Sequence, residues 1–129
     1  MRIEGNSRMM SVLLLEDNPD MLMMLRQVLE WGGYQVITGR DGTDGITALK
    51  QGESLPNIIV SDLSMPEMDG FDVLRYVRST PEWANIPFVI MSAHSSPDDR
   101  RNALNRGADE FLIKPFSLED FQRVLQRWE

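Results

Sequence analysis

Short apolar runs alternate with longer stretches whose apolar residues recur at helical spacing along most of the chain. The runs are nearly all apolar inside and end abruptly in polar residues, which is typical of parallel strands covered on both faces. They predict five strands, at residues 11–16, 35–38, 57–62, 87–92 and 110–113. Because strands and helices alternate, we expect βαβ units and a doubly wound parallel α/β sheet with helices on both faces.

Start and stop signals divide the helical stretches into five helices. Asn18 followed by Pro19 is typical of a helix start, and Gly32 with Gly33 is typical of a stop. Later helices are expected to begin at Asp41, Asp69, Ser96 and Ser117, with Asp99 and Asp120 completing capping boxes and with stops at Gly52, Pro81 and Gly107. The local signals therefore agree with the predicted sheet.

Composition narrows the class of protein. A chain of 129 residues with 42% hydrophobic and 26% charged residues is typical of one folded domain. The net charge of −7 disfavours binding to nucleic acid, and no apolar run is long enough to cross a membrane. Cysteine is absent, which excludes thiol chemistry and fits a cytoplasmic protein. Residues 1–8 are polar and patternless, so we expect a leader or disordered tail there and one domain over residues 9–129.

Acidic side chains follow two of the predicted strands. Glu16 and Asp17 end the first strand and Asp62 ends the third. The carboxyl ends of parallel strands meet at one edge of the sheet, so these three carboxylates are expected to lie together, where they repel one another without a cation. Ligation by oxygen alone suits Mg²⁺. The alternative is that Glu16 and Asp17 merely cap the next helix, where negative charge is favourable.

The ends of the remaining strands favour the metal site. Ser92 closes the fourth strand and Lys114 follows the fifth, which adds a hydroxyl and a cation to the same edge. Carboxylates, a metal, a hydroxyl and an ammonium group are what phosphoryl transfer requires, and a carboxylate can be the nucleophile. Lys114 precedes Pro115, and a cis bond there is one way to aim the lysine inward.

Four segments carry a resemblance to a known family. They are residues 13–18, 60–70, 90–93 and 107–116, and together they make the chain from residue 10 to 128 resemble a receiver domain of two-component response regulators, similar to the chemotaxis receiver. The resemblance implies a flavodoxin-like sheet with strand order 2-1-3-4-5 and five helices.

The same resemblance implies a role for each residue of the edge. Asp62 would be the phosphoacceptor, Mg²⁺ would be held by Glu16, Asp17, Asp62 and the backbone carbonyl of Ser64, Ser92 would bind a phosphoryl oxygen, Lys114 would pair with the phosphoryl group, and Phe111 would be the switch aromatic that moves inward.

The implied function is a switch rather than a turnover enzyme. The phosphoryl group would come from the phosphohistidine of a sensor histidine kinase or a histidine phosphotransfer protein, and the change of shape would regulate an output partner or domain. The alternative is a phosphatase of the haloacid-dehalogenase type. That class needs a second aspartate two residues after the nucleophile, where this chain has Ser64, and a cap domain for which the chain lacks room. The interpretation as a nucleotide-binding module has even less support, because no phosphate-binding glycine motif occurs in the sequence.

Three positions depart from many relatives or carry an open role. Ser64 is smaller than the residue many receivers have there, and with His94 it lines the approach to the phosphoryl group in the family, so the hydrolysis rate cannot be carried over. We interpret His94 itself as an exposed loop residue. Phe111 replaces the commoner tyrosine and lacks its hydroxyl.

Two surfaces are candidates for partners. In the helix over residues 19–31, the positions expected to face the sheet are Met21, Met24, Leu25, Val28 and Leu29. Leu22 and Met23 then remain outside as a patch for docking the phosphodonor, unless the helix is rotated and one of them is core. The last two helices carry Arg100, Arg101, Arg123 and Arg127. These arginines would form a phosphorylation-dependent dimer face or, as we favour, simply be solvated charges.

Overall fold

A computed structural model describes residues 10–94 and 96–129, so the tail predicted at residues 1–8 lies outside the described residues. The chain alternates strands and helices as predicted. The elements are β1 (Ser11–Leu15), α1 (Pro19–Trp31), β2 (Gln35–Gly39), α2 (Gly42–Gln51), β3 (Ile58–Asp62), α3 (Gly70–Arg78), β4 (Phe88–Ser92), α4 (Pro97–Asn105), β5 (Glu110–Ile113) and α5 (Leu118–Gln126).

The strands form one parallel sheet in the order β2-β1-β3-β4-β5, which confirms the predicted topology. The predicted strand limits differ from the observed ones by at most one residue at an end. For example, Glu16 lies just beyond β1, although its N–H still donates to the carbonyl of Gly39 at 3.1 Å. All five strands therefore point their carboxyl ends toward the same edge.

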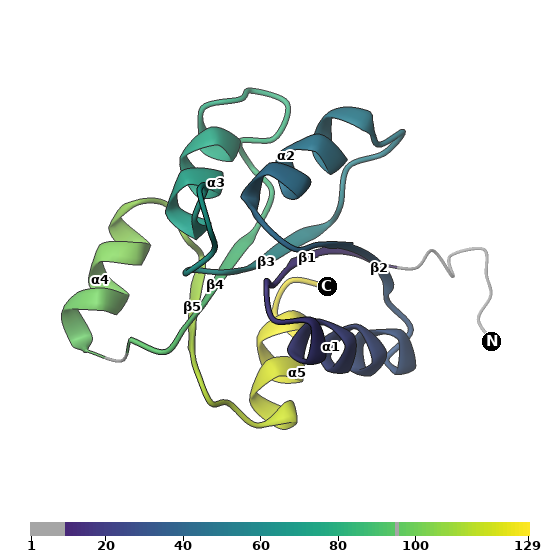
Figure 1. Ribbon diagram of the computed structural model, residues 1–129, viewed down its shortest axis with the longest axis vertical. Helices are drawn as coiled ribbons and strands as arrows, with labels where there is room; N and C mark the ends of the chain where they lie inside the picture. Colours follow the sequence, from purple (N-terminus) through teal and green to yellow (C-terminus); the bar gives the residue numbers. More distant parts are fainter. Residues whose placement is uncertain (1–9, 95) are drawn as a thin grey trace.

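Helices cover both faces of the sheet, with α1 and α5 on one side and α2, α3 and α4 on the other (Figure 1). Alternate residues of each central strand enter one of two apolar cores. Leu14 and Val60 pack with α1 and α5, whereas Leu15 and Ile59 pack with the core on the α2 and α3 side. Burial of β1, β3 and β4 on both faces explains why their sequences are continuously apolar.

Caps fix where the helices begin, and with them the loops that carry the site. The side chain of Asn18 accepts from the N–H groups of Asp20 and Met21, both at 3.0 Å, and Ser96 forms the predicted capping box with Asp99. At Ser117 the structure shows one bond of the predicted box, from the N–H of Asp120. A second complete box, between Asp69 and Asp72, was not predicted.

The rotation of α1 differs from the prediction. Met24, expected to face the sheet, is 45% exposed, while Leu25, Val28 and Leu29 are buried as expected. Leu22 is partly buried and packs against the core of the α1 and α5 side. Of the two residues expected outside, Met23 is the fully exposed one, at 70%. The alternative of a slightly rotated helix with one of the pair near the core is therefore the better description.

Helix α4 is attached differently from the other helices. Among its nine residues, Ala103 is the one that is buried. Just beyond its C-terminal end, Arg78 of α3 donates to the carbonyl of Gly107 at 3.0 Å and pairs with Asp109 at 2.9 Å. The end of α4 nearer β5 is thus tied to α3 by polar contacts. Within the described residues, no helix is long and apolar enough to cross a membrane.

Candidate functional site

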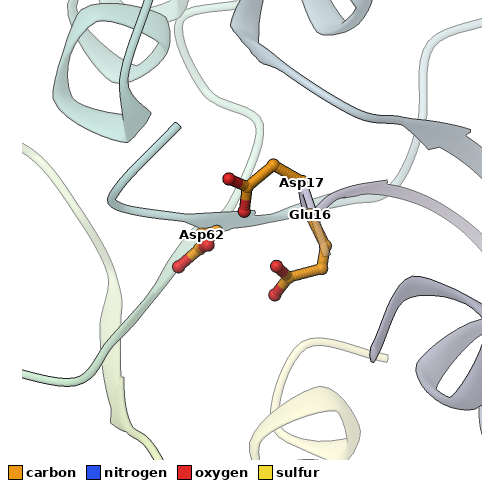
Figure 2. Close-up of side chains that lie close together, drawn as sticks. All are labelled: Glu16, Asp17 and Asp62. Atoms are coloured by element: carbon orange, nitrogen blue, oxygen red, sulfur yellow. The ribbon is translucent and has the colours of Figure 1, made fainter. Parts of the chain in front are cut away.

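Three carboxylates meet at the carboxyl edge of the sheet. Glu16 and Asp17 follow β1, and Asp62 is the last residue of β3. One oxygen of each lies within 4.8 Å of the others, and Figure 2 shows the three side chains turned toward a common space. The convergence expected from the sequence is therefore present, and its cause is the parallel pairing of β1 with β3.

Lys114 reaches into this acidic cluster from the residue after β5. Its Nζ donates to Oε1 of Glu16 at 2.8 Å and lies 3.1 Å from Oδ1 of Asp62. The Lys114–Pro115 peptide bond is cis. Burial acts to lower the pKa of Lys114, but the hydrogen bond to Glu16 and the charge of Asp62 outweigh it, so the pKa is raised. The side chain is therefore a fixed positive charge at neutral pH.

Glu16 is almost completely buried, with 1% of its surface exposed. Both of its oxygens have partners, since Oε1 accepts from Lys114 and Oε2 accepts from the N–H of Asn18 at 3.1 Å. A buried carboxylate is stable only when paired and hydrogen-bonded in this way. Glu16 therefore acts as a fixed negative charge that also orients the lysine.

Asp62 has a different environment. Burial, followed by the charge of Glu16, raises the pKa of Asp62 to about 6, and Lys114 opposes this increase. The group is still mainly ionised at neutral pH, where it is both electron-rich and poorly solvated. These are the properties of a carboxylate that binds a cation or attacks an electrophile.

The donor set fits Mg²⁺. Three carboxylates face one ammonium group, which leaves two negative charges without compensation at this edge. All the available ligand atoms are oxygens, as magnesium prefers. The cluster borders an open cleft of about 620 Å³, whose lining includes Asp17, Ser64 and His94 and which leaves room for retained water. A hydrated divalent cation therefore matches the site in charge, ligand type and space.

Ser92 and His94 lie on the same edge. Ser92 is buried at the end of β4, opposite Ile113 in the register with β5, and its Oγ accepts from the N–H of His94 at 3.0 Å. His94 is exposed, as predicted. Ser64 is exposed in the loop after Asp62, and the predicted ligation by its carbonyl stays a prediction.

Phe111 is already buried, at 5% exposed, in the core that also contains Ile90 and Ala103. The structure thus holds this ring inward. The predicted inward movement would start from a ring that points outward, and that arrangement is not the one observed. The carbonyl of Phe111 accepts from Arg100 of α4 at 3.3 Å. Phe111 therefore contacts α4 through its backbone carbonyl, and its ring lies in the same apolar core as Ala103 of α4.

Five residues that line the open cleft were not predicted from the sequence, namely Leu63, Met65, Pro66, Asp69 and Phe71. Asp69 and Phe71 border the cleft beside Asp17. Asp69 ends the segment that links β3 to α3, and Phe71 is the second residue of α3, so their position shortly after a strand end at the carboxyl edge was the available signal. Because Asp69 is also the N-cap of α3, its role as a cap was the more obvious reading.

Comparison with known proteins defines the class. The model of the response regulator receiver domain matches residues 12–126, which is nearly the whole described chain. The chain therefore belongs to this family, the receiver domains of two-component response regulators. No comparison supports the phosphatase of the haloacid-dehalogenase type.

Individual relatives agree with this class. The transcriptional regulatory protein KdpE of Mycobacterium tuberculosis is 37% identical over 110 residues, covering 85% of this chain and 46% of the relative. This chain thus spans about half the length of that regulator. A 14.6 kDa protein of Leptolyngbya boryana is 33% identical and matches along 92% of this chain and 89% of its own.

Solved structures share the fold. The chemotaxis protein CheY4 of Vibrio cholerae superimposes with a TM-score of 0.87 at 29% identity, covering 95% of this chain and all of the other. The receiver domain of a sensor histidine kinase of Pseudomonas aeruginosa gives a TM-score of 0.81 at 31% identity, covering 94% and 98%. That structure has a magnesium ion coordinated in its active-site cleft.

Proposed function

We propose that this chain is a phosphorylation switch in which Asp62 is the phosphoacceptor. The observation that carries the proposal is the position of Asp62, at the end of β3 with Lys114 3.1 Å away and Glu16 and Asp17 beside it. A carboxylate oxygen of Asp62 attacks phosphorus, the bond from phosphorus to the donor's imidazole nitrogen breaks, and the imidazole keeps the electron pair. The product is an acyl phosphate on Asp62.

The chain's own residues offer groups that bind the phosphoryl oxygens and neutralise their negative charge. Lys114 offers a half-buried ammonium group to the arriving phosphoryl oxygens, and Ser92 offers a hydroxyl from the adjacent strand. Phosphoryl transfer asks a protein mainly for positioning and charge neutralisation. The chain thus promotes its own modification without turning over a separate substrate, which is why we do not class it as a conventional enzyme.

Magnesium is the proposed cofactor. Glu16, Asp17 and Asp62 would hold it, with the carbonyl of Ser64 as a further ligand. The ion neutralises the negative charge that gathers when a phosphoryl group approaches carboxylates. The acidic cluster and the magnesium ion in the related receiver of the Pseudomonas kinase support this assignment.

Removal of Asp17 tests the metal assignment. Asp17→Ala should weaken Mg²⁺ binding by at least about tenfold, because the ion loses a charged oxygen ligand that the remaining groups cannot replace. The measurement is a magnesium titration followed by amide chemical shifts. Asp20→Ala, which removes a nearby carboxylate outside the cluster, is the matched control. Equal affinities in the wild-type chain and Asp17→Ala would refute the assignment.

The output would be a change of shape around α4. One hydrogen bond to a charged group contributes about 1.5–3 kcal/mol, whereas moving a population from 1:99 to 99:1 needs about 5.5 kcal/mol. Ser92 alone is therefore insufficient. Lys114 and the loop after Ser92 must contribute, with Phe111 coupling the loop to α4.

Beryllofluoride, which mimics a phosphoryl group, tests this coupling. With Mg²⁺ present it should shift the amide resonances of residues 93–94 and 96–106 in the wild-type chain. In Ser92→Ala these shifts should be markedly smaller, although the ligand still binds at Asp62. Ser79→Ala, whose hydroxyl donates to carbonyls of its own helix, is the control. An undiminished response in Ser92→Ala would remove Ser92 from the mechanism.

Receiver domains of response regulators interact with histidine kinases and with output domains. The phosphodonor proposed here is a sensor histidine kinase or a histidine phosphotransfer protein, docking on α1 at Leu22 and Met23. The shallow pocket that these two residues line with Arg26 supports this surface. The proposed place of action is the cytoplasm, as for response regulators generally.

A phosphorylation-dependent dimer has less support. The four arginines considered for it already have partners in the chain: Arg100 bonds to the carbonyl of Phe111, Arg101 to Asp98, Arg123 to Asp120, and Arg127 to Glu110. Three of these contacts are exposed ion pairs, which contribute little to stability. This pattern favours the interpretation as solvated surface charge.

A further inference from the structure

A second cavity lies between α3 and the C-terminal end of α4. Both helices cover the face of the sheet opposite α1 and α5 (Figure 1). Its volume is about 350 Å³, and its lining consists of Phe71, Arg75, Arg78, Ser79 and Arg106. Three arginines thus share one small concavity in a chain whose net charge is −7. The four residues from α3 and its C-cap share one face because they recur at helical spacing.

The positive charge of this cavity is only partly compensated. Arg75 pairs with Asp72 at 2.8 Å and Arg78 with Asp109 at 2.9 Å. Each aspartate also serves the backbone, since Asp72 accepts from the N–H of Asp69 and Asp109 accepts from that of Phe88. Two shared carboxylates therefore stand against three guanidinium groups.

Arg78 forms the fixed part of the cavity. Besides Asp109 it donates to the carbonyls of Gly107, Ala84 and Ile86, at 3.0, 3.1 and 2.7 Å. Its side chain is 23% exposed. Arg78 is therefore held rigidly in place and contributes charge with little freedom to move.

Arg106 forms the adaptable part. Its guanidinium carbon lies 4.5 Å from the centroid of the Phe71 ring, and its Nε donates to Asn102 at 3.1 Å. Within the described residues, its two terminal nitrogens make no further hydrogen bond. The guanidinium lies over the aromatic ring with its two terminal nitrogens available, which suits bidentate binding of an oxyanion.

We propose that this cavity binds a small phosphorylated molecule, whose phosphate is held by Arg75 and Arg106 above Arg78. The volume of about 350 Å³ lies near the lower end of the range of about 300–1,000 Å³ found for small-molecule sites. A phosphate dianion matches the excess of guanidinium groups better than a single carboxylate does. The proposal does not depend on phosphorylation of Asp62.

The site also has a structural connection to the phosphoacceptor. Phe71 lines both this cavity and the cleft that contains Asp17 and His94. Arg106 lies at the end of α4, and Arg75 and Arg78 belong to α3. A bound phosphate would therefore bridge the two helices beside the ring that separates the two sites.

The test is an amide chemical-shift titration of the full chain without Mg²⁺, at constant ionic strength. The probes are inorganic phosphate and adenosine monophosphate, with adenosine as the uncharged reference. We expect saturable shifts at residues 71–79 and 106–107 with the phosphate-bearing probes and none with adenosine. Arg106→Gln and Arg75→Gln should each weaken binding at least tenfold. Arg101→Gln on the same helix, outside the cavity, should bind as the wild-type chain does.

The outcomes separate the possibilities. Tighter binding of adenosine monophosphate than of phosphate would support a nucleotide-like ligand, and equal binding would support free phosphate. The proposal is overturned if neither probe gives a saturable shift, or if Arg101→Gln weakens binding as much as Arg106→Gln does. The side chains of Arg75 and Arg106 are exposed, and thermal unfolding of each variant checks that the fold is retained. Arg106→Lys keeps the charge without the planar group and should bind with intermediate affinity.

Discussion

Replacement of Asp62 by asparagine is expected to abolish Mg²⁺-dependent phosphorylation by acetyl phosphate and by a phosphohistidine donor. An amide oxygen is a poor nucleophile, and its uncharged group is a weak ligand for the cation that draws the phosphoryl group in. Intact-mass measurement should show the added phosphoryl group on the wild-type chain and none on Asp62→Asn.

The control is Asp41→Asn, since asparagine is as good an N-cap as aspartate and the cap at α2 is retained. This variant should be labelled at the wild-type rate. If Asp62→Asn gained the phosphoryl mass with unchanged kinetics, the acceptor would lie elsewhere in the chain.

Asp62→Asn should also stabilise the fold in the absence of Mg²⁺. The pKa of Asp62 is raised from 3.8 to about 6 on folding, so the unfolded chain loses this proton before the folded chain does. Stability contributed by this group therefore falls as pH rises through that window, and the full cost is present at neutral pH. Removing the charge should raise the free energy of unfolding by about 1–3 kcal/mol at pH 7.5. The gain should vanish near pH 3.5, as urea unfolding at the two pH values would show.

The second large effect expected is a variant that loses phosphorylation by its protein donor but keeps phosphorylation by acetyl phosphate. The double change Leu22→Glu/Met23→Lys should leave labelling by acetyl phosphate intact, because it touches none of the acidic cluster. Transfer from the cognate phosphohistidine protein should slow at least tenfold, since the partner would have to bury charges against α1. Met23, which is 70% exposed, contributes apolar surface that a partner can cover.

Leu22 is partly buried, so Met23→Lys alone is needed beside the double variant. It should show a smaller loss in the same direction. Leu104→Glu/Leu118→Lys, which changes two other exposed apolar side chains, controls for surface charge and hydrophobicity. Equal loss with both donors would indicate a damaged site, and no loss with either would exclude α1 as the docking surface.

Much of the architecture was predictable because the sequence repeats its signals at several levels. Doubly buried strands must be continuously apolar, and caps such as Asn18 and Ser96 mark helix starts with side chains that serve the backbone directly. Once the strands were parallel, the meeting of Glu16, Asp17 and Asp62 followed from topology alone.

The rest depends on contacts that local patterns do not encode. Residues 21–25 of α1 are five consecutive apolar residues. A small rotation of the helix about its axis therefore exchanges Met24 and Leu22 between surface and core. The bonds of Arg78 to Gly107 and Asp109 and the pairing of Lys114 with Glu16 join residues far apart in sequence. Such contacts become visible only when the fold is assembled.

Helix α4 has fewer buried side chains than α3, so the two helices should differ in how easily they are displaced from the sheet. Helix α3 buries Val73, Leu74 and Val77, and displacing those side chains would cost about 1.5–3 kcal/mol for each one exposed. Helix α4 buries only Ala103 among its own residues. A single hydrogen bond to a phosphoryl oxygen would contribute about 1.5–3 kcal/mol, which is less than the summed cost of exposing the three buried side chains of α3. A change of shape that begins at Ser92 should therefore displace α4 more readily than α3, because α4 has fewer buried side chains to expose.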